Sequence, residues 1–165
     1  MPEPILIWGA GAIGGILGAF WARAGVPVQM VDIVAEHAEA CTTNGLIIEG
    51  PVEQFTQVVP CVTPDQLSGT YARVVLAVKA QATPRAMGQL LPHLALDGFV
   101  LSAQNGLNER VIADRAGAER TMGAFINYGS DYQSPGTSPA APGARQAPAI
   151  QPGPSQRRSS PAIRT

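Results

Sequence analysis

The sequence predicts an α/β protein with a doubly wound parallel sheet and a disordered C-terminal tail, and three observations predict it. Short apolar runs recur along the chain, and each is too short for a stable helix, which suits strands buried on both faces of a sheet. Helical patterns of apolar residues alternate with these runs, as they do in βαβ units. A segment rich in proline, alanine, serine and arginine then ends the sequence.

The first of these units carries the most specific pattern. The apolar run over 5–8 is followed by Gly9, Gly11 and Gly14 at the spacing G-x-G-x-x-G, the pattern of a Rossmann-type strand-to-helix turn. The first glycine permits the tight turn, the second lets a pyrophosphate approach the backbone, and the third lets the helix pack close to the sheet. Free N–H groups and the helix dipole favour negative charge there, so we expect a dinucleotide-binding turn.

The next elements complete the unit. Apolar residues continue at helical spacing from Ile13, and Gly25 stands where the helix would end. A second strand over 28–31 ends at Asp32, close to the roughly 20-residue offset from the glycines at which an acid accepts hydrogen bonds from the adenosine ribose. Two alternatives stay open: a glycine-rich turn that binds nothing, and an Asp32 that serves only as a turn residue or helix cap.

Further strand and helix patterns follow as far as residue 128. The Gly50-Pro51 turn between two short strands marks an insertion into a simple βαβ plan. In chain order we expect a helix over 34–43, strands over 46–49, 52–59 and 74–78, a helix that includes Met87, Leu90, Leu91 and Leu94, a strand over 98–103, a helix over 109–116 and a strand over 121–128.

Polar side chains follow two of these strands. Lys79 and Gln81 come after one buried run, and Asn105 comes after the next. Ligands of doubly wound sheets lie beyond the carboxyl ends of the strands, so we expect these residues near the cofactor. The alternatives are an ordinary solvated lysine and a simple turn at Asn105-Gly106, because Asn and Gly both tolerate a positive φ.

The composition argues against several classes of function. The 165 residues carry a formal net charge of −1, so nothing points to a nucleic acid or to an anionic membrane as a partner. The two cysteines and two histidines are scattered, which suggests neither a metal site nor a disulfide framework. The first residues lack the basic region and long apolar run of a secretory signal, so we expect a cytoplasmic protein.

Residues 137–165 differ in composition from the rest of the chain. They contain four arginines, no acidic residue and, among large apolar residues, only Ile150 and Ile163. Such a segment cannot bury enough surface to offset its ordering entropy. We therefore expect a dinucleotide-binding domain over 1–136 and a disordered tail over 137–165.

Three motifs follow one another along the sequence: Gly-Ala-Gly-Ala-Ile-Gly-Gly, Val-Lys-Ala-Gln and Gln-Asn-Gly-Leu. Over residues 4 to about 136 the chain resembles the amino-terminal domain of the ketopantoate reductase (2-dehydropantoate 2-reductase) family. The resemblance implies hydride transfer from NADPH to the 2-keto group of ketopantoate, a small keto acid, on the pathway to pantothenate. It places Lys79 and Asn105 at the cofactor and substrate edge and Gly129 beside the nicotinamide. It also implies that the pyrophosphate is bound by Gly9, Ala10, Gly11, Ala12, Ile13 and Gly14.

Two features depart from the family's pattern. Members that use NADPH usually place an arginine after the second strand to pair with the 2′-phosphate, whereas this chain has Asp32-Ile33. The family thus implies NADP, and the aspartate favours NAD. In the family a helical carboxyl-terminal domain supplies the lysine that acts as general acid and a substrate-binding glutamate, and residues 137–165 do not resemble it. The catalytic residues of this chain are therefore unknown, and we expect the chain alone to be inactive.

The abrupt change in composition after Gly136 resembles a truncated or frame-shifted product, with a natural basic linker as the alternative. The leading hypothesis is a ketopantoate reductase-like oxidoreductase represented by its cofactor domain. A nucleotide-binding remnant without catalysis and a reductase of another small 2-keto acid remain alternatives. The oligomeric state stays open.

Overall fold

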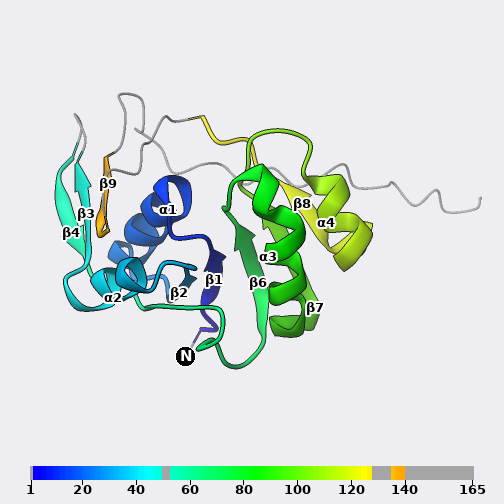
Figure 1. Cartoon of the computed structure of the whole chain (residues 1–165), viewed down its shortest axis with the longest axis horizontal. Coiled ribbons are helices and arrows are strands. Elements are labelled where there is room, and N and C mark those ends of the chain that lie inside the picture. Colours follow the sequence, from blue (N-terminus) through cyan, green and yellow to red (C-terminus); the bar gives the residue numbers. More distant parts are fainter. Residues whose placement is uncertain (1, 50–52, 128–134, 140–165) are drawn as a thin grey trace, which may run out of the picture.

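A parallel sheet forms the centre of the computed structural model, which describes residues 2–49, 53–127 and 135–139 (Figure 1). Six strands pair in the order β5-β2-β1-β6-β7-β8, and every pair is parallel. Their bounds are β1 Ile5–Trp8, β2 Val28–Val31, β5 Cys61–Val62, β6 Tyr71–Leu76, β7 Leu94–Ser102 and β8 Thr121–Gly123. The strand order reverses between β1 and β6, so the predicted doubly wound fold is confirmed.

Helices cover both faces of this sheet. The α-helices of the described residues are α1 Ala12–Arg23, α2 Ala35–Thr43, α3 Thr83–Leu90 and α4 Glu109–Ala116. Successive side chains of β1 point to opposite faces of the sheet: Ile7 packs with α1, whereas Leu6 and Trp8 pack with α3 and α4. All three side chains are buried, which explains why no polar residue interrupts this strand.

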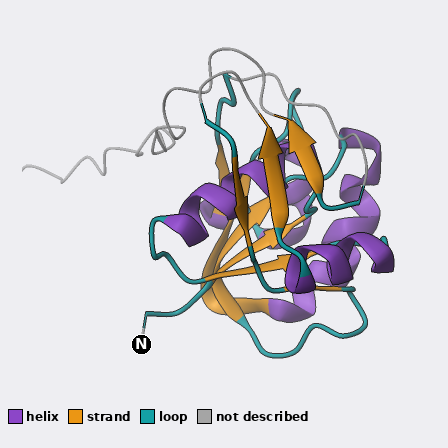
Figure 2. Ribbon diagram, turned by 90° about the vertical axis from the view of Figure 1, so that its left-hand side faces the viewer, coloured by secondary structure: helices purple, strands orange, loops and turns teal. Residues whose placement is uncertain are grey.

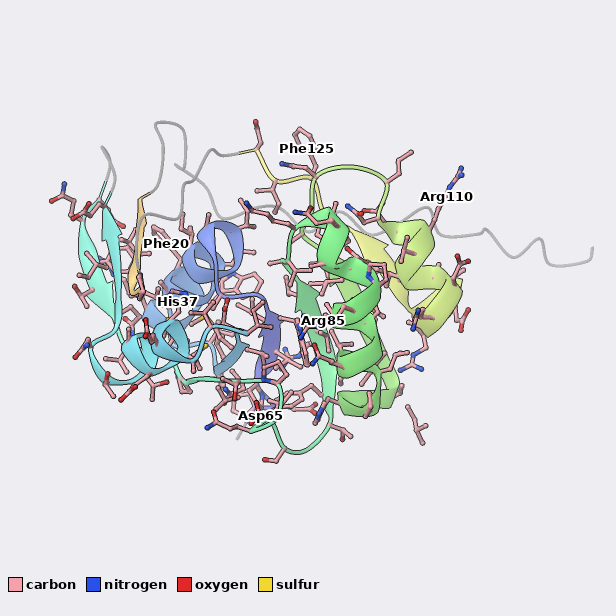
Figure 3. All side chains as sticks on the ribbon, viewed as in Figure 1. Phe20, His37, Asp65, Arg85, Arg110 and Phe125 are labelled. Atoms are coloured by element: carbon pink, nitrogen blue, oxygen red, sulfur yellow. The ribbon has the colours of Figure 1, made fainter. Side chains whose placement is uncertain are left out.

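A second, smaller sheet packs on α1. Its strands are β4 Phe55–Gln57, β3 Leu46–Glu49 and β9 Thr137–Pro139, with β3 antiparallel to β4 and parallel to β9. Figure 2 shows these three strands in front of the helices. Phe20 of α1, labelled in Figure 3, contacts Phe55 at a centroid distance of 5.0 Å, and Arg23 lies over the Phe55 ring. The small sheet therefore covers the helix that begins at the glycine turn.

The C-terminal part of the domain differs from the expectation. Residues 137–139 were expected in the disordered tail, but they form β9, because an edge of β3 is available for pairing in three dimensions. The strand expected over 121–128 is β8, which ends at Gly123. Residues 128–134 and 140–165 lie outside the described residues, and so does most of the expected tail.

Other elements also differ from the expectation; the strand expected over 74–78 is β6, which spans Tyr71–Leu76. Leu94 was expected in a helix, but it begins β7 after a 3₁₀ turn over Leu91–His93. The strand expected over 52–59 is β4, which is shorter, and residues 50–52 are not described. The two-residue strand β5 was not expected, since it is too short to produce a periodic pattern. Within the described ranges, no helix is both long and apolar enough to cross a membrane.

Candidate functional site

Two glycines of the turn between β1 and α1 are required by the fold itself. Gly9 has a φ of +101°, and a Cβ there would lie 2.9 Å from Cγ1 of Val78. A Cβ on Gly14 would lie 1.8 Å from the carbonyl oxygen of Gly9 and 3.0 Å from Cγ2 of Ile7. These two glycines let β1, α1 and the end of β6 meet closely, which is the turn and packing role that their spacing predicts.

Gly11 differs from both neighbours. It is the N-cap residue of α1 with a φ of −70°, which any residue can adopt. A Cβ added there would meet no heavy atom of the described chain within 4 Å. The fold therefore does not require a glycine at this position. The open space lies at the start of α1, where the helix dipole favours a negative group.

The peptide of Ala10 is held on both sides. Its N–H donates to Oδ2 of Asp32 at 2.9 Å, and its carbonyl oxygen accepts from Nε2 of His37 at 2.8 Å. Oδ1 of Asp32 accepts from the N–H of Val34 at 3.0 Å, at the start of α2. Asp32 therefore has a structural role in its turn and lies beside the glycine turn as well.

His37 connects the glycine turn with the small sheet (Figure 3). The N–H of Gly136 donates to Nδ1 at 3.0 Å, so the ring proton lies on Nε2 and is donated to Ala10. Burial lowers the pKa of His37, but hydrogen bonds with Cys41 and with the Ala10 carbonyl outweigh it and raise the pKa to about 8. Because an imidazolium ring has no lone pair for Gly136, we assign the neutral ring. One signal for this role is visible in the sequence: at helical spacing His37 shares the buried face of α2 with Ala38 and Cys41.

Two buried thiols lie next to His37. Cys41 and Cys61 are free, and Sγ of Cys41 is 3.7 Å from Nε2 of His37. The hydrogen bond with Cys41 and burial raise the pKa of the Cys61 thiol. Within the part of the chain that the structure describes, no group of three or more His, Cys, Asp or Glu side chains could hold a metal ion. These thiols therefore pack as part of the core.

The carboxyl ends of three strands lie at one edge, next to the glycine turn. Trp8, Leu76 and Ser102, the last residues of β1, β6 and β7, pair with one another in register. Lys79 and Asn105 follow the ends of β6 and β7, and both are exposed. The structure therefore brings the two polar motifs predicted from sequence to the same edge as the glycines. Gly129, the remaining expected site residue, lies outside the described residues.

Gln104 joins the ends of β6 and β7, and sequence analysis did not single it out. Its Nε2 donates to the carbonyl oxygen of Val78 at 2.6 Å and to Oγ1 of Thr83 at 2.8 Å. The turn that follows is held by Nδ2 of Asn108, which donates to the carbonyl oxygen of Asn105 at 2.9 Å. A sequence motif cannot reveal such a link, because Val78 and Gln104 meet only in the folded sheet.

Comparison with known proteins gives the family of this chain. The model of the family described as "Ketopantoate reductase PanE/ApbA" matches residues 5–146. The chain belongs to the ketopantoate reductase family. The match passes residue 136, where the domain was expected to end, and includes β9.

Curated relatives in the ketopantoate reductase family carry the name 2-dehydropantoate 2-reductase. The relative from Pyrococcus horikoshii is 32% identical over 138 residues, which are 80% of this chain and 42% of the relative. The relative from Mesorhizobium japonicum is 38% identical over 104 residues, which are 62% of this chain and 32% of the relative. The chain thus spans less than half the length of the curated relatives it matches.

Solved structures share the fold. A 2-dehydropantoate 2-reductase from Geobacter metallireducens matches with a TM-score of 0.76 and 30% identity, over 84% of this chain and 46% of that protein. A D-mandelate dehydrogenase solved with NADH and anilino(oxo)acetate matches with a TM-score of 0.77 and 22% identity, over 83% of this chain and 45% of its own. At 22% identity, the similarity to the D-mandelate dehydrogenase shows a shared fold and nothing more.

Proposed function

We propose that this member of the ketopantoate reductase family binds a nicotinamide dinucleotide at the carboxyl edge of its large sheet, as the cofactor-binding part of a 2-dehydropantoate 2-reductase. The contrast within the glycine turn carries the proposal. Gly9 and Gly14 are glycines because the fold leaves no room for a Cβ, whereas Gly11 faces open space. A ligand that approaches the backbone accounts for a glycine that the fold does not require. A pyrophosphate suits this position, because α1 begins there.

Other residues of the edge have separate roles in the proposed complex. The turn over 9–14, with Ala10, Ala12 and Ile13, holds the pyrophosphate, and Asp32 accepts hydrogen bonds from the adenosine ribose. Each carboxylate oxygen of Asp32 accepts one backbone N–H and keeps lone-pair capacity for a ribose hydroxyl. Gly129 is placed beside the nicotinamide on the family resemblance alone.

The proposed cofactor is NADH. A carboxylate at Asp32 would repel the 2′-phosphate of NADPH, and the residues that follow are Ile33 and Val34, whose side chains are largely exposed and carry no charge. The family's use of NADPH keeps NADP as the alternative. The choice depends on one side chain, which makes it testable by substitution.

Lys79 and Asn105 are proposed to contact the nicotinamide end of the cofactor and the substrate. The bound cofactor supplies the hydride that reduces the keto group. Lys79, the one lysine in the sequence, places a positive charge at the edge, which favours an anionic keto acid. The amide of Asn105 can both donate to and accept from a bound substrate. Neither residue is proposed as the acid that protonates the product.

We propose binding without turnover for this chain alone, because it matches less than half of its curated relatives. A dinucleotide-binding module without catalysis is the second candidate, favoured by the same observation. A reductase of another small 2-keto acid is the third candidate function, since the sequence and the fold do not define which 2-keto acid is bound. The cytoplasmic location expected from the sequence belongs to this proposal as well.

The substitution Gly11→Asp tests the proposal. It places a side chain and a negative charge in the open space, so we expect at least a tenfold weaker affinity for the dinucleotide, with little change in thermal stability. Gly88→Asp is the control, because Gly88 is an exposed glycine of α3 and a Cβ added there would lie 4.0 Å from Nη1 of Arg115, without a clash. Isothermal titration and thermal unfolding measure both properties. An unchanged affinity in Gly11→Asp would remove the glycine turn from the site.

A further inference from the structure

A buried side-chain amide spans the two strand ends that carry Lys79 and Asn105. Gln104 is 7% exposed. The two groups that accept hydrogen bonds from its amide nitrogen belong to Val78, after the end of β6, and to Thr83, at the start of α3. Buried polar groups of this kind are costly unless they are paired, so the arrangement is specific. The link reaches from the β7 end to the β6 end, across the edge assigned to the cofactor.

The orientation of the amide follows from its partners. The Val78 carbonyl oxygen can only accept, so the nitrogen of Gln104, and not its oxygen, faces Val78. The second Nε2 hydrogen goes to Oγ1 of Thr83, and Oε1 accepts from the hydroxyl of Ser102 at 3.4 Å. Both donor hydrogens are therefore in use. A methionine would fill a similar volume but could donate to neither partner.

Each of the two linked residues, Val78 and Gln104, is followed in the sequence by an exposed polar residue. Val78 directly precedes Lys79, whose carbonyl oxygen accepts from Ala82 at the 3₁₀ turn before α3. Asn105 directly follows Gln104. The hydrogen bond from Gln104 to Val78 therefore joins the segment that leads into Lys79 to the segment that leads into Asn105.

We propose that Gln104 is a positioning residue that fixes the separation of Lys79 and Asn105, so that both side chains reach one bound dinucleotide. This inference rests on the proposed function of the edge. Gln104 touches neither cofactor nor substrate; it acts through the Val78 carbonyl and through its own backbone. The contributions of Lys79 and Asn105 to affinity are therefore coupled to Gln104.

A double-mutant cycle on the full 165-residue chain tests the coupling, with NADH as the titrant. We expect Gln104→Met to raise the Kd for NADH about fivefold, since both hydrogen bonds are lost. We expect Lys79→Ala to raise the Kd about tenfold in the wild-type chain and less than about threefold in the Gln104→Met chain. The same pattern is expected for Asn105→Ala. A purely structural role would leave the effects of Lys79→Ala and Asn105→Ala the same in both chains.

Gln29→Met is the matched control. Gln29 also donates from Nε2 to backbone carbonyls, those of Met30 and Pro60, but it lies in the amino-terminal half of β2 and not beyond a carboxyl end. We expect additive effects in that background. If Gln104→Met does not fold, Thr83→Val replaces it, because this change removes only the hydroxyl partner and should reduce the coupling in part.

The outcomes separate this inference from the proposed function. NADH binding with additive effects at Gln104 overturns the positioning role and leaves the proposed function intact. If Lys79→Ala and Asn105→Ala leave the wild-type affinity for NADH unchanged, both the positioning role and the cofactor contacts proposed for these two residues are wrong, whereas dinucleotide binding at the glycine turn stands. A wild-type chain that binds no NADH overturns both.

Discussion

At the scale of single residues, one spacing pattern contains glycines of two kinds. Gly9 and Gly14 are explained by atoms of the chain itself, whereas a Cβ on Gly11 would meet no described atom within 4 Å, and the proposed ligand accounts for that glycine. The spacing predicted all three positions and a distinct role for each. It could not supply the contacting atom at Val78, because that contact depends on how β6 is placed beside β1.

This difference predicts that the same substitution affects stability strongly at one glycine and hardly at the other. Gly14→Ala would place a Cβ against the Gly9 carbonyl, so we expect a loss of about 3 kcal/mol or more in the free energy of unfolding. Gly11→Ala meets open space and should change stability by less than about 0.5 kcal/mol. Urea unfolding followed by the fluorescence of buried Trp8 measures both values. Similar losses for the two variants would contradict the account of the turn.

Asp32 decides the proposed choice of cofactor. We expect Asp32→Arg to change the ratio of the Kd values for NADH and NADPH by at least about tenfold in favour of NADPH, because a guanidinium pairs with the 2′-phosphate. Asp32→Asn is the control: it removes the charge, keeps one acceptor oxygen for Ala10 and should weaken NADH binding without a comparable gain for NADPH. Equal ratios in all three proteins would place Asp32 outside the site.

At the scale of elements, the sequence predicted best where local pattern and tertiary environment agree. β1, β2 and α4 have the expected bounds, since continuous apolar runs and a helical pattern mark them without ambiguity. β5 and β9 are short, and their pairing partners lie far away in sequence, so no local period identifies them. The two exposed polar motifs were placed at the correct edge because parallel strands share one direction. The roles of His37 and Gln104 were not predicted, because each contacts a backbone carbonyl of a distant segment, Ala10 and Val78 respectively.

His37 predicts a dependence of the glycine turn on the small sheet. His37→Ala removes the bonds to Ala10 and Gly136 and leaves a cavity, so we expect a loss of about 2 to 4 kcal/mol in the free energy of unfolding. His93→Ala is the control. His93 is half-buried with one hydrogen bond, to Gly69, and its removal should cost less than about 1 kcal/mol. Chemical denaturation compares the two, and equal losses would argue against a structural link through His37.

At the scale of the whole molecule, exposed apolar side chains follow the strand ends at the proposed cofactor edge. Leu107 and Phe125 come after β7 and β8 and are 80% and 83% exposed; Phe125 is labelled in Figure 3. We propose that this edge stays accessible to water in this chain alone, which disfavours hydride transfer to a keto acid even when the cofactor is held in place. The proposed behaviour is therefore binding of a dinucleotide without efficient reduction.

The most direct test is a calorimetric titration of the 165-residue chain with NADH and with NADPH, run beside an assay of ketopantoate-dependent NADH oxidation. We expect tighter binding of NADH than of NADPH and no ketopantoate-dependent oxidation. Rapid oxidation would show that the chain alone supplies the acid and would contradict the proposed division of roles. Absence of binding by either nucleotide would contradict the central claim that this edge is a cofactor site.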